Sequence, residues 1–245
     1  TLHTLHTSYQ MKADQYDVLL HTYYGPKIEN CDLSGLIQCG GRSFSPNPNE
    51  AWRNRDYSLD IMPQEYSTCG VGDFRLSSME LELPNGSHTA DLRYEGFRLE
   101  KGKYELEGLP AFHCDGNEAE TLIISLKDHA AQVAVELYYS VFEDFDLITR
   151  ALRVVNQGKD SVRLCRCASL CLDFLRSDLD MITFDGHHLM ERCMDRGPLR
   201  SGVQSTGSVR GTSSHQHNPF VILCDQDADE DAGVCYGAML LYSGN

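Results

Sequence analysis

The sequence predicts an all-β protein, a large β-sandwich of mainly antiparallel strands. Short apolar runs that alternate with polar residues recur along the 245-residue chain, roughly 10 to 15 residues apart, with polar turns between them. No amphipathic helical pattern of about a dozen residues interrupts them. The chain is long enough for one large β domain with a buried core, and no linker-like stretch divides it. We therefore expect a single domain over residues 1–245.

The strand pattern is found in order along the chain, at Ser8–Lys12, Val18–Tyr24, Met79–Leu83, Asp91–Leu99, Leu122–Leu126, Val133–Tyr139, Ile148–Val155, Val162–Asp173, Phe220–Cys224 and Val234–Tyr242. Pro84-Asn85-Gly86 predicts a tight turn, and the irregularity at Gly96 predicts a bulge. Lys127–His129 is expected to close one hairpin. Asn156–Asp160 is expected to close another, which would pair Ile148–Val155 with Val162–Asp173.

Between the second and third strands the pattern fails from Gly40 to about Phe74. Pro46 and Pro48 exclude a helix and a central strand there. Arg55–Arg75 is the densest polar and aromatic run of the sequence, and disordered tracts are poor in aromatic residues. We therefore expect a long, ordered loop on the surface, of the kind that carries function.

Charge and cysteine content restrict the expected classes of partner and the expected cellular compartment. The net charge of −15 repels phosphate backbones and anionic lipids, so neither nucleic acid nor a membrane is expected as a partner. A neutral, hydroxyl-rich ligand or another protein fits this charge. The polar opening segment Thr1–Asp17 resembles no secretory leader, so the ten cysteines are expected to be reduced and the protein cytoplasmic.

No metal site is predicted. Four segments contain possible metal ligands, but none has the ligand spacing of a zinc or calcium site. They are His187-His188, His215-x-His217, Cys165-x-Cys167 and the acidic run Asp225–Asp231. Cys165 and Cys167 would share one packed face of a strand. The acidic run would form the solvated tip of a hairpin.

No catalytic residue and no cofactor is predicted either. The paired acids at Glu143–Asp146 and at Asp178 and Asp180 are expected to be turn residues. No nucleophile elbow, P-loop or dinucleotide fingerprint is present in the sequence. Two polar segments remain, the long loop and Arg210–Phe220. Either could hold neighbouring loops by hydrogen bonds or line a sugar site.

A set of motifs, read together and in order, resembles the amino-terminal part of the family 36 glycoside hydrolases, the bacterial α-galactosidases. The matching pieces are Tyr23–Ile28, Phe44–Pro48, Ser58–Asp60, Pro63–Tyr66, Gly72–Arg75, Asp91–Tyr94, Gly108–Ala111, Glu118–Leu122, Gly202–Gln204, Arg210–Phe220, Tyr236–Gly237 and Tyr242–Asn245. The resemblance implies a β-supersandwich, which a catalytic (β/α)₈ barrel and a small carboxy-terminal β domain would follow outside this chain. It also implies that the sandwich is incomplete here and lacks its last strands.

The same resemblance implies the function. The full-length protein is expected to be a retaining α-galactosidase that acts on raffinose-type and melibiose-type galactosides, with both catalytic aspartates in the barrel. This chain alone is expected to be inactive, to support a tetramer and to help shape a sugar pocket at the barrel of another subunit. Arg55, just before Asp56-Tyr-Ser-Leu-Asp60, is the residue that the resemblance marks as a substrate contact.

Two departures from the family pattern bear on sugar preference. Gly41 stands where relatives often have an aspartate, and Cys193 stands where they tend to have an aromatic residue. An alternative function of a different class stays open, that of a free-standing carbohydrate-binding or structural β-sandwich module. The exposed aromatic residues expected in the long loop favour that alternative.

Overall fold

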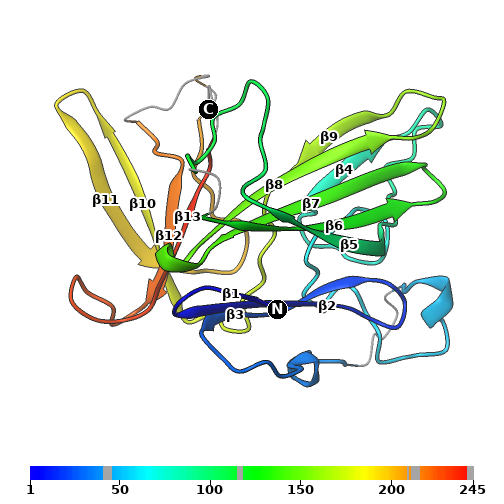
Figure 1. Ribbon diagram of the computed structural model, residues 1–245, viewed down its shortest axis with the longest axis horizontal. Helices are drawn as coiled ribbons and strands as arrows, with labels where there is room; N and C mark the ends of the chain where they lie inside the picture. Colours follow the sequence, from blue (N-terminus) through cyan, green and yellow to red (C-terminus); the bar gives the residue numbers. More distant parts are fainter. Residues whose placement is uncertain (41–45, 115–117, 209, 211–215, 242–245) are drawn as a thin grey trace. The chain divides into compact units, whose positions relative to one another are not determined.

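The computed structural model, shown in Figure 1, describes residues 1–40, 46–114, 118–208, 210 and 216–241. Its described elements are strands and three short 3₁₀ turns, and every sheet is antiparallel, so the all-β prediction is confirmed. The chain forms two compact units, Thr1–Tyr104 with Cys114–Phe174, and Glu105–His113 with Leu175–Asn245. Within the described residues no helix is long and apolar enough to cross a membrane. The expectation of a single, incomplete domain stays a prediction.

The first unit contains three sheets. The sheet order is β1-β2-β3 in one, β5-β6-β7-β8 in the second and β4-β9 in the third (Figure 1). Their bounds are β1 Leu2–His3, β2 Thr7–Ala13, β3 Leu19–Pro26, β4 Met79–Glu82, β5 Arg93–Lys101, β6 Glu120–Asp128, β7 Val133–Phe142, β8 Leu147–Asn156 and β9 Arg163–Cys167. Most of these strands lie where the alternating pattern predicted them.

Strand β7 explains how the sequence builds the core of this unit. Val133, Val135, Leu137 and Tyr139 alternate along β7, and each is at most 1 % exposed. Residues two apart on a strand share a face, so the alternation places all four on the core side. They pack in one cluster with residues of β2, β4 and β6. Burial of such side chains stabilises the fold by roughly 1.5–3 kcal/mol each.

The predicted turns and the predicted bulge are confirmed. Gly86 N donates a hydrogen bond to Leu83 O at 2.8 Å, which closes the tight turn after β4. The register between β5 and β6 shifts between Tyr94 and Gly96, as a bulge requires. Asp128 pairs with Val133, so β6 and β7 form the expected hairpin.

The predicted hairpin between Ile148–Val155 and Val162–Asp173 is wrong. Strand β8 pairs with β7 along its length, whereas β9 pairs with β4, from Met79 opposite Cys167 to Glu82 opposite Arg163. An alternating pattern shows which face of a strand is buried but not which sheet edge it joins. β9 supplies the backbone partner that β4 needs. The expected packed face is also wrong, because Cys165 and Cys167 lie exposed on β9.

Asp146 ties the connection between β1 and β2 to the turn between β7 and β8. It follows the 3₁₀ turn η3 (Glu143–Phe145), so the turn prediction for these acids is confirmed. Its Oδ1 accepts from the Thr4 hydroxyl at 2.7 Å and from His6 N at 2.8 Å, and its Oδ2 lies 2.7 Å from His6 Nδ1. The hydrogen bonds from Thr4 and His6 lower the pKa of the Asp146 carboxyl to about 2.

This lowered pKa predicts an acid-dependent part of the stability. A carboxyl whose pKa is lower in the folded state stabilises the fold fully above its unfolded pKa, about 4, and that contribution is lost as the pH falls through the folded pKa. Asp146→Asn should therefore lower the melting temperature near neutral pH, and the difference from the wild type should shrink toward about pH 2. Thermal unfolding at both pH values measures it, with the neighbouring exposed Asp144→Asn as control. An undiminished difference in acid would contradict the assignment.

The second unit is built on one four-stranded sheet of order β11-β10-β12-β13, whose bounds are β10 Leu179–His187, β11 Met190–Pro198, β12 Phe220–Asp225 and β13 Cys235–Met239. The hairpin of β12 and β13 with its acidic tip is confirmed. Strands β10 and β11 were not expected from the sequence. Asp180 lies within β10 and accepts from Arg196 Nε at 2.8 Å, so its assignment to a turn is wrong.

Candidate functional site: the long loop and its anchors

The long loop connects β3 to β4 and is internally packed. Its described residues contain no strand, but two 3₁₀ turns occur, η1 (Ser34–Leu36) and η2 (Asn49–Ala51). The expectation of a surface loop is wrong for its middle part, because Tyr57, Leu59 and Met62 are at most 4 % exposed. These three side chains form a small core of their own with Val18 and Leu20, together with Ala51. Hydrophobic burial therefore orders a segment that lacks regular structure.

Glu65 anchors the middle of the loop, and its side chain is fully buried. Its Oε1 accepts hydrogen bonds from the Tyr9 and Tyr139 hydroxyls and from Arg150 Nη1, each at 2.7 Å. His21 Nδ1 donates to Oε2 at 3.1 Å. These four partners lie on β2, β7, β8 and β3. One carboxylate therefore ties the loop to two sheets of the first unit.

The charge state of this cluster follows from its contacts. Burial alone would raise the pKa of Glu65, but Arg150 and His21 outweigh burial, so its pKa is lowered. Burial and the Glu65 charge raise the pKa of Tyr9 well above its ordinary value. The Arg150 guanidinium carbon also lies 4.0 Å from the centroid of the Tyr139 ring. The cluster thus pairs a buried carboxylate with a buried guanidinium, and neutral tyrosines donate to it.

A second anchor holds the end of the loop around Asp73. Gln64 Nε2 donates to Asp73 Oδ2 at 2.7 Å, and Arg75 Nη2 donates to the same oxygen at 2.9 Å. Arg75 Nη2 also donates to Met62 O at 2.8 Å, and Arg75 Nη1 lies 3.1 Å from Asp173 Oδ2. Arg75 therefore connects Met62, in the buried middle of the loop, with Asp73 near the end of the loop.

Gly72 allows two parts of the loop to approach closely. Its φ is +95°, and a Cβ at this position would lie 2.6 Å from Pro46 O. Gly72→Ala is expected to lower the free energy of unfolding by about 1–3 kcal/mol or more, because both the backbone and the contact are strained. Gly86→Ala is the control, since Gly86 has φ +78° but open space around its Cβ position. Chemical denaturation should rank Gly72→Ala as the more costly change, and equal costs would contradict the close contact.

Arg55 lies on an exposed turn of the loop, just before its buried middle part. The turn is held by Asn54 N, which donates to Ala51 O at 2.8 Å, and by Asn47 Nδ2, which donates to the same oxygen at 2.6 Å. Trp52 is 60 % exposed, and the Arg53 guanidinium carbon lies 4.6 Å from its ring centroid. Arg55 is exposed, and within the described residues its side chain has no hydrogen bond or ion pair. The exposed turn therefore carries Arg55, whose guanidinium is unpaired among the described residues, three positions after the exposed Trp52.

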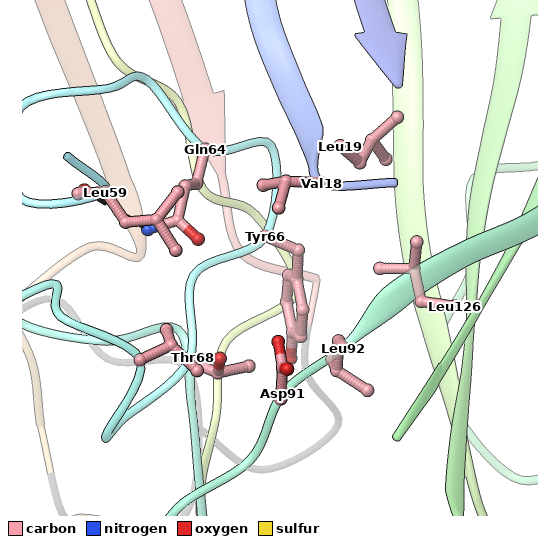
Figure 2. A pocket seen from close by; sticks show the side chains of 10 residues that line it. Val18, Leu19, Leu59, Gln64, Tyr66, Thr68, Asp91, Leu92 and Leu126 are labelled. Atoms are coloured by element: carbon pink, nitrogen blue, oxygen red, sulfur yellow. Dashed lines mark hydrogen bonds between the residues drawn. The ribbon is translucent and has the colours of Figure 1, made fainter. Parts of the chain in front are cut away.

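Among the described residues, the cavity beside the loop is too small for a sugar. Figure 2 shows the side chains that line this cavity. Its volume is about 10 Å³, enough for about one water molecule. Its lining residues are Val18, Leu19, Leu59, Gln64, Tyr66, Thr68, Val71, Asp91, Leu92 and Leu126. An open groove of about 340 Å³ has no aromatic side chain in its lining, which consists of Thr1, Gln10, Met11, Lys12, Asn30, Cys31 and Asp32. The exposed turn is thus the better candidate for a sugar contact.

The remaining candidate residues either lie outside the described part of the chain or give no sign of a ligand site. Gly41 and residues 211–215, with His215 among them, lie outside the described residues. Cys193 is exposed on β11. His217 Nδ1 lies 2.8 Å from Asp185 Oδ1, and Asn218 Nδ2 donates to Phe184 O at 3.2 Å, so this end of the Arg210–Phe220 segment holds the second unit's own sheet. No group of three potential metal ligands occurs among the described residues.

The described strands form antiparallel sheets, and the long loop between β3 and β4 is anchored to two of them. Residues 17–245 match the family model of the glycosyl hydrolase family 36 N-terminal domain, and the chain belongs to that family. The resemblance in its ordered motifs is therefore confirmed.

Curated relatives give the same family. The bifunctional α-galactosidase/sucrose kinase AgaSK of Mediterraneibacter gnavus is 46 % identical over all of this chain, which covers 26 % of that protein. The α-galactosidase AgaA of Geobacillus stearothermophilus is 41 % identical over 97 % of this chain, which covers 32 % of AgaA. This chain therefore spans between a quarter and a third of the length of these relatives.

Solved structures share the fold. The galactosidase domain of AgaSK superposes with a TM-score of 0.95 at 45 % identity, over all of this chain and 34 % of that one. A variant of AgaA in complex with 1-deoxygalactonojirimycin superposes with the same TM-score at 40 % identity, again over all of this chain and 34 % of that one. A second AgaA variant, in complex with raffinose, gives a TM-score of 0.92 at 40 % identity, over 96 % of this chain and 33 % of that chain.

Proposed function

We propose that this chain is the non-catalytic amino-terminal part of an α-galactosidase that hydrolyses terminal α-D-galactosyl residues of oligosaccharides such as raffinose and melibiose. In this proposal the domain supports a tetramer and shapes the sugar pocket, while the chemistry occurs in a downstream barrel. Arg55 contacts the substrate. The protein works in the cytoplasm, an assignment that fits its ten free thiols.

The observation that carries this proposal is the pairing of the family fold with an anchored loop that exposes Arg55, a guanidinium without a partner among the described residues. Relatives with this fold have been solved with raffinose and with 1-deoxygalactonojirimycin bound. Sugar sites are commonly built from planar polar groups that meet hydroxyls and from aromatic rings that stack on sugar faces. Arg55 and Trp52 supply one of each at the exposed turn. Glu65 and Arg75 fix the later part of that loop to the sheets and to its own backbone.

Calorimetry with galactose separates this proposal from a free-standing carbohydrate-binding module. The full-length protein is expected to bind galactose saturably, and the isolated 245-residue chain is expected to show no saturable binding. The exposed rings of Trp52 and Phe74, 60 % and 72 % exposed, are the observation that favours the module. Saturable binding of galactose by the isolated, folded chain would support the module and overturn the proposal.

A further inference from the structure

Cys224 and Cys235 form a pair of facing thiols in the second unit. Cys224 lies near the end of β12 and Cys235 begins β13, two strands that run side by side (Figure 1). The two residues are direct cross-strand partners. Side chains directly opposite each other in an antiparallel pair stand on the same face of the sheet. The two sulfur atoms are therefore neighbours by the register of the hairpin.

The hydrogen bonds of the hairpin fix the spacing of this pair. Asp225 N donates to Val234 O at 3.0 Å, so this neighbouring pair is hydrogen-bonded and the Cys224–Cys235 pair is not. Cα atoms in such a pair lie about 4.5 Å apart, whereas disulfides span about 4.4–6.8 Å. A disulfide thus fits within its range of Cα separations, at the short end. On the same sheet Cys193 faces Asp185, which offers no second thiol.

Access and charge give the two thiols different roles. Cys224 is 1 % exposed, whereas Cys235 is exposed, so a dissolved reagent reaches only the second sulfur. Burial raises the pKa of the Cys224 thiol, and the Arg196 guanidinium opposes that rise. Arg196 is held at this end of the hairpin, because its Nη1 donates to Ala228 O at 2.7 Å and its Nη2 to Asp225 O at 3.0 Å. Cys235 is therefore the sulfur that meets a dissolved oxidant, and Cys224 is the buried partner that can resolve the mixed disulfide.

We propose that Cys224 and Cys235 are a reversible dithiol–disulfide site, oxidised by a small soluble disulfide such as oxidised glutathione. The Cys235 thiolate attacks one sulfur of the oxidant, the oxidant's S–S bond breaks, and one glutathione thiolate leaves and takes up a proton. The Cys224 thiolate then attacks Cys235 Sγ, and the second glutathione leaves. Two protein thiols are oxidised and one glutathione disulfide is reduced to two thiols. The new bond covalently closes the hairpin around its acidic tip.

Peptide mapping without reductant tests this site in the full-length protein after incubation with excess oxidised glutathione. We expect the peptides containing Cys224 and Cys235 to be joined, with the loss of two hydrogens, and to separate again in excess reduced glutathione. Cys193→Ser is the matched control and should form the same link. Cys224→Ser should retain glutathione on Cys235, whereas Cys235→Ser should leave Cys224 unmodified. A folded wild type that keeps both thiols free, or that stops at glutathione on Cys235, would overturn the proposal.

Discussion

Replacing Glu65 by alanine is expected to lower the free energy of unfolding of the first unit by about 3–5 kcal/mol. Glu65 is fully buried, and removal of its carboxylate leaves Arg150, a guanidinium whose side chain is only 7 % exposed, without its ion-pair partner. The hydroxyls of Tyr9 and Tyr139 lose their acceptor as well. Loss of one partner from a buried pair is costly because the remaining charge stays desolvated.

Urea unfolding followed by circular dichroism measures this change at neutral pH. Glu65→Gln keeps the shape of the side chain but removes its charge, and it should recover only part of the loss. Glu95→Gln is the matched control, because among the described residues Glu95 pairs only with His129, at the exposed surface, and it should change stability by less than about 0.5 kcal/mol. If the free energy of unfolding of Glu65→Ala lies within about 0.5 kcal/mol of the wild-type value, the carboxylate does not anchor the loop.

Acid should weaken the same anchor. The pKa of Glu65 is lowered in the folded protein, so its contribution is complete above the unfolded pKa of about 4.3 and is lost progressively as the pH falls from there through the lower, folded pKa. The difference in stability between the wild type and Glu65→Gln should therefore narrow in acid. A difference that is independent of pH would mean that the carboxyl is not ionised in the fold.

Replacing Arg55 by alanine in the full-length protein is expected to lower kcat/KM for an α-galactoside by about 10- to 100-fold, the range that follows from the loss of one hydrogen bond from a charged donor. The stability should change by less than about 0.5 kcal/mol, because the Arg55 side chain is exposed and unpaired among the described residues. The two measurements together distinguish a substrate contact from a structural role.

Steady-state kinetics and thermal unfolding of the same preparations provide the comparison. Arg163→Ala is the matched control, since Arg163 is an arginine of β9 whose side chain is 78 % exposed and whose ion-pair partner in the described part of the chain is Glu82, at 3.3 Å. It should leave kcat/KM unchanged. An Arg55→Ala enzyme with wild-type kinetics would remove Arg55 from the sugar pocket.

Local sequence patterns predicted what is local in the structure. The alternation in Val133–Tyr139 gave both the strand and its buried face, since a period of two leaves one choice of face. The turn at Gly86 and the bulge at Gly96 were equally readable, because glycine marks positions where the backbone departs from the regular strand. These elements depend on neighbours within a few residues.

The pairing of β9 with β4 and the Glu65 cluster were not predictable in this way. Glu65 meets partners from β2, β3, β7 and β8, and Arg150 is 85 positions away from it in sequence. No local pattern separates a carboxylate that will be buried in such a cluster from one that will face water. The apolar spacing of Tyr57, Leu59 and Met62 was the available signal that the loop packs inward. That signal was hard to recognise because these apolar residues are separated by polar ones and lie in a segment rich in turn-forming residues.

The stretch from Arg55 to Arg75 now has two parts with different tasks. Its middle and end, through Glu65 and Arg75, fix the loop to the sheets. Its beginning presents Arg55 to the surroundings. In the proposed function the first task supports the second, and none of the acids in this stretch acts in the chemistry.

Turnover of an aryl α-galactoside by the full-length protein tests the central claim most directly. The proposal predicts steady release of the aryl group by the full-length protein and none by the isolated chain. Circular dichroism and thermal unfolding establish that both preparations are folded. A full-length protein that is correctly folded and releases no aryl group would contradict the claim that this domain belongs to an α-galactosidase.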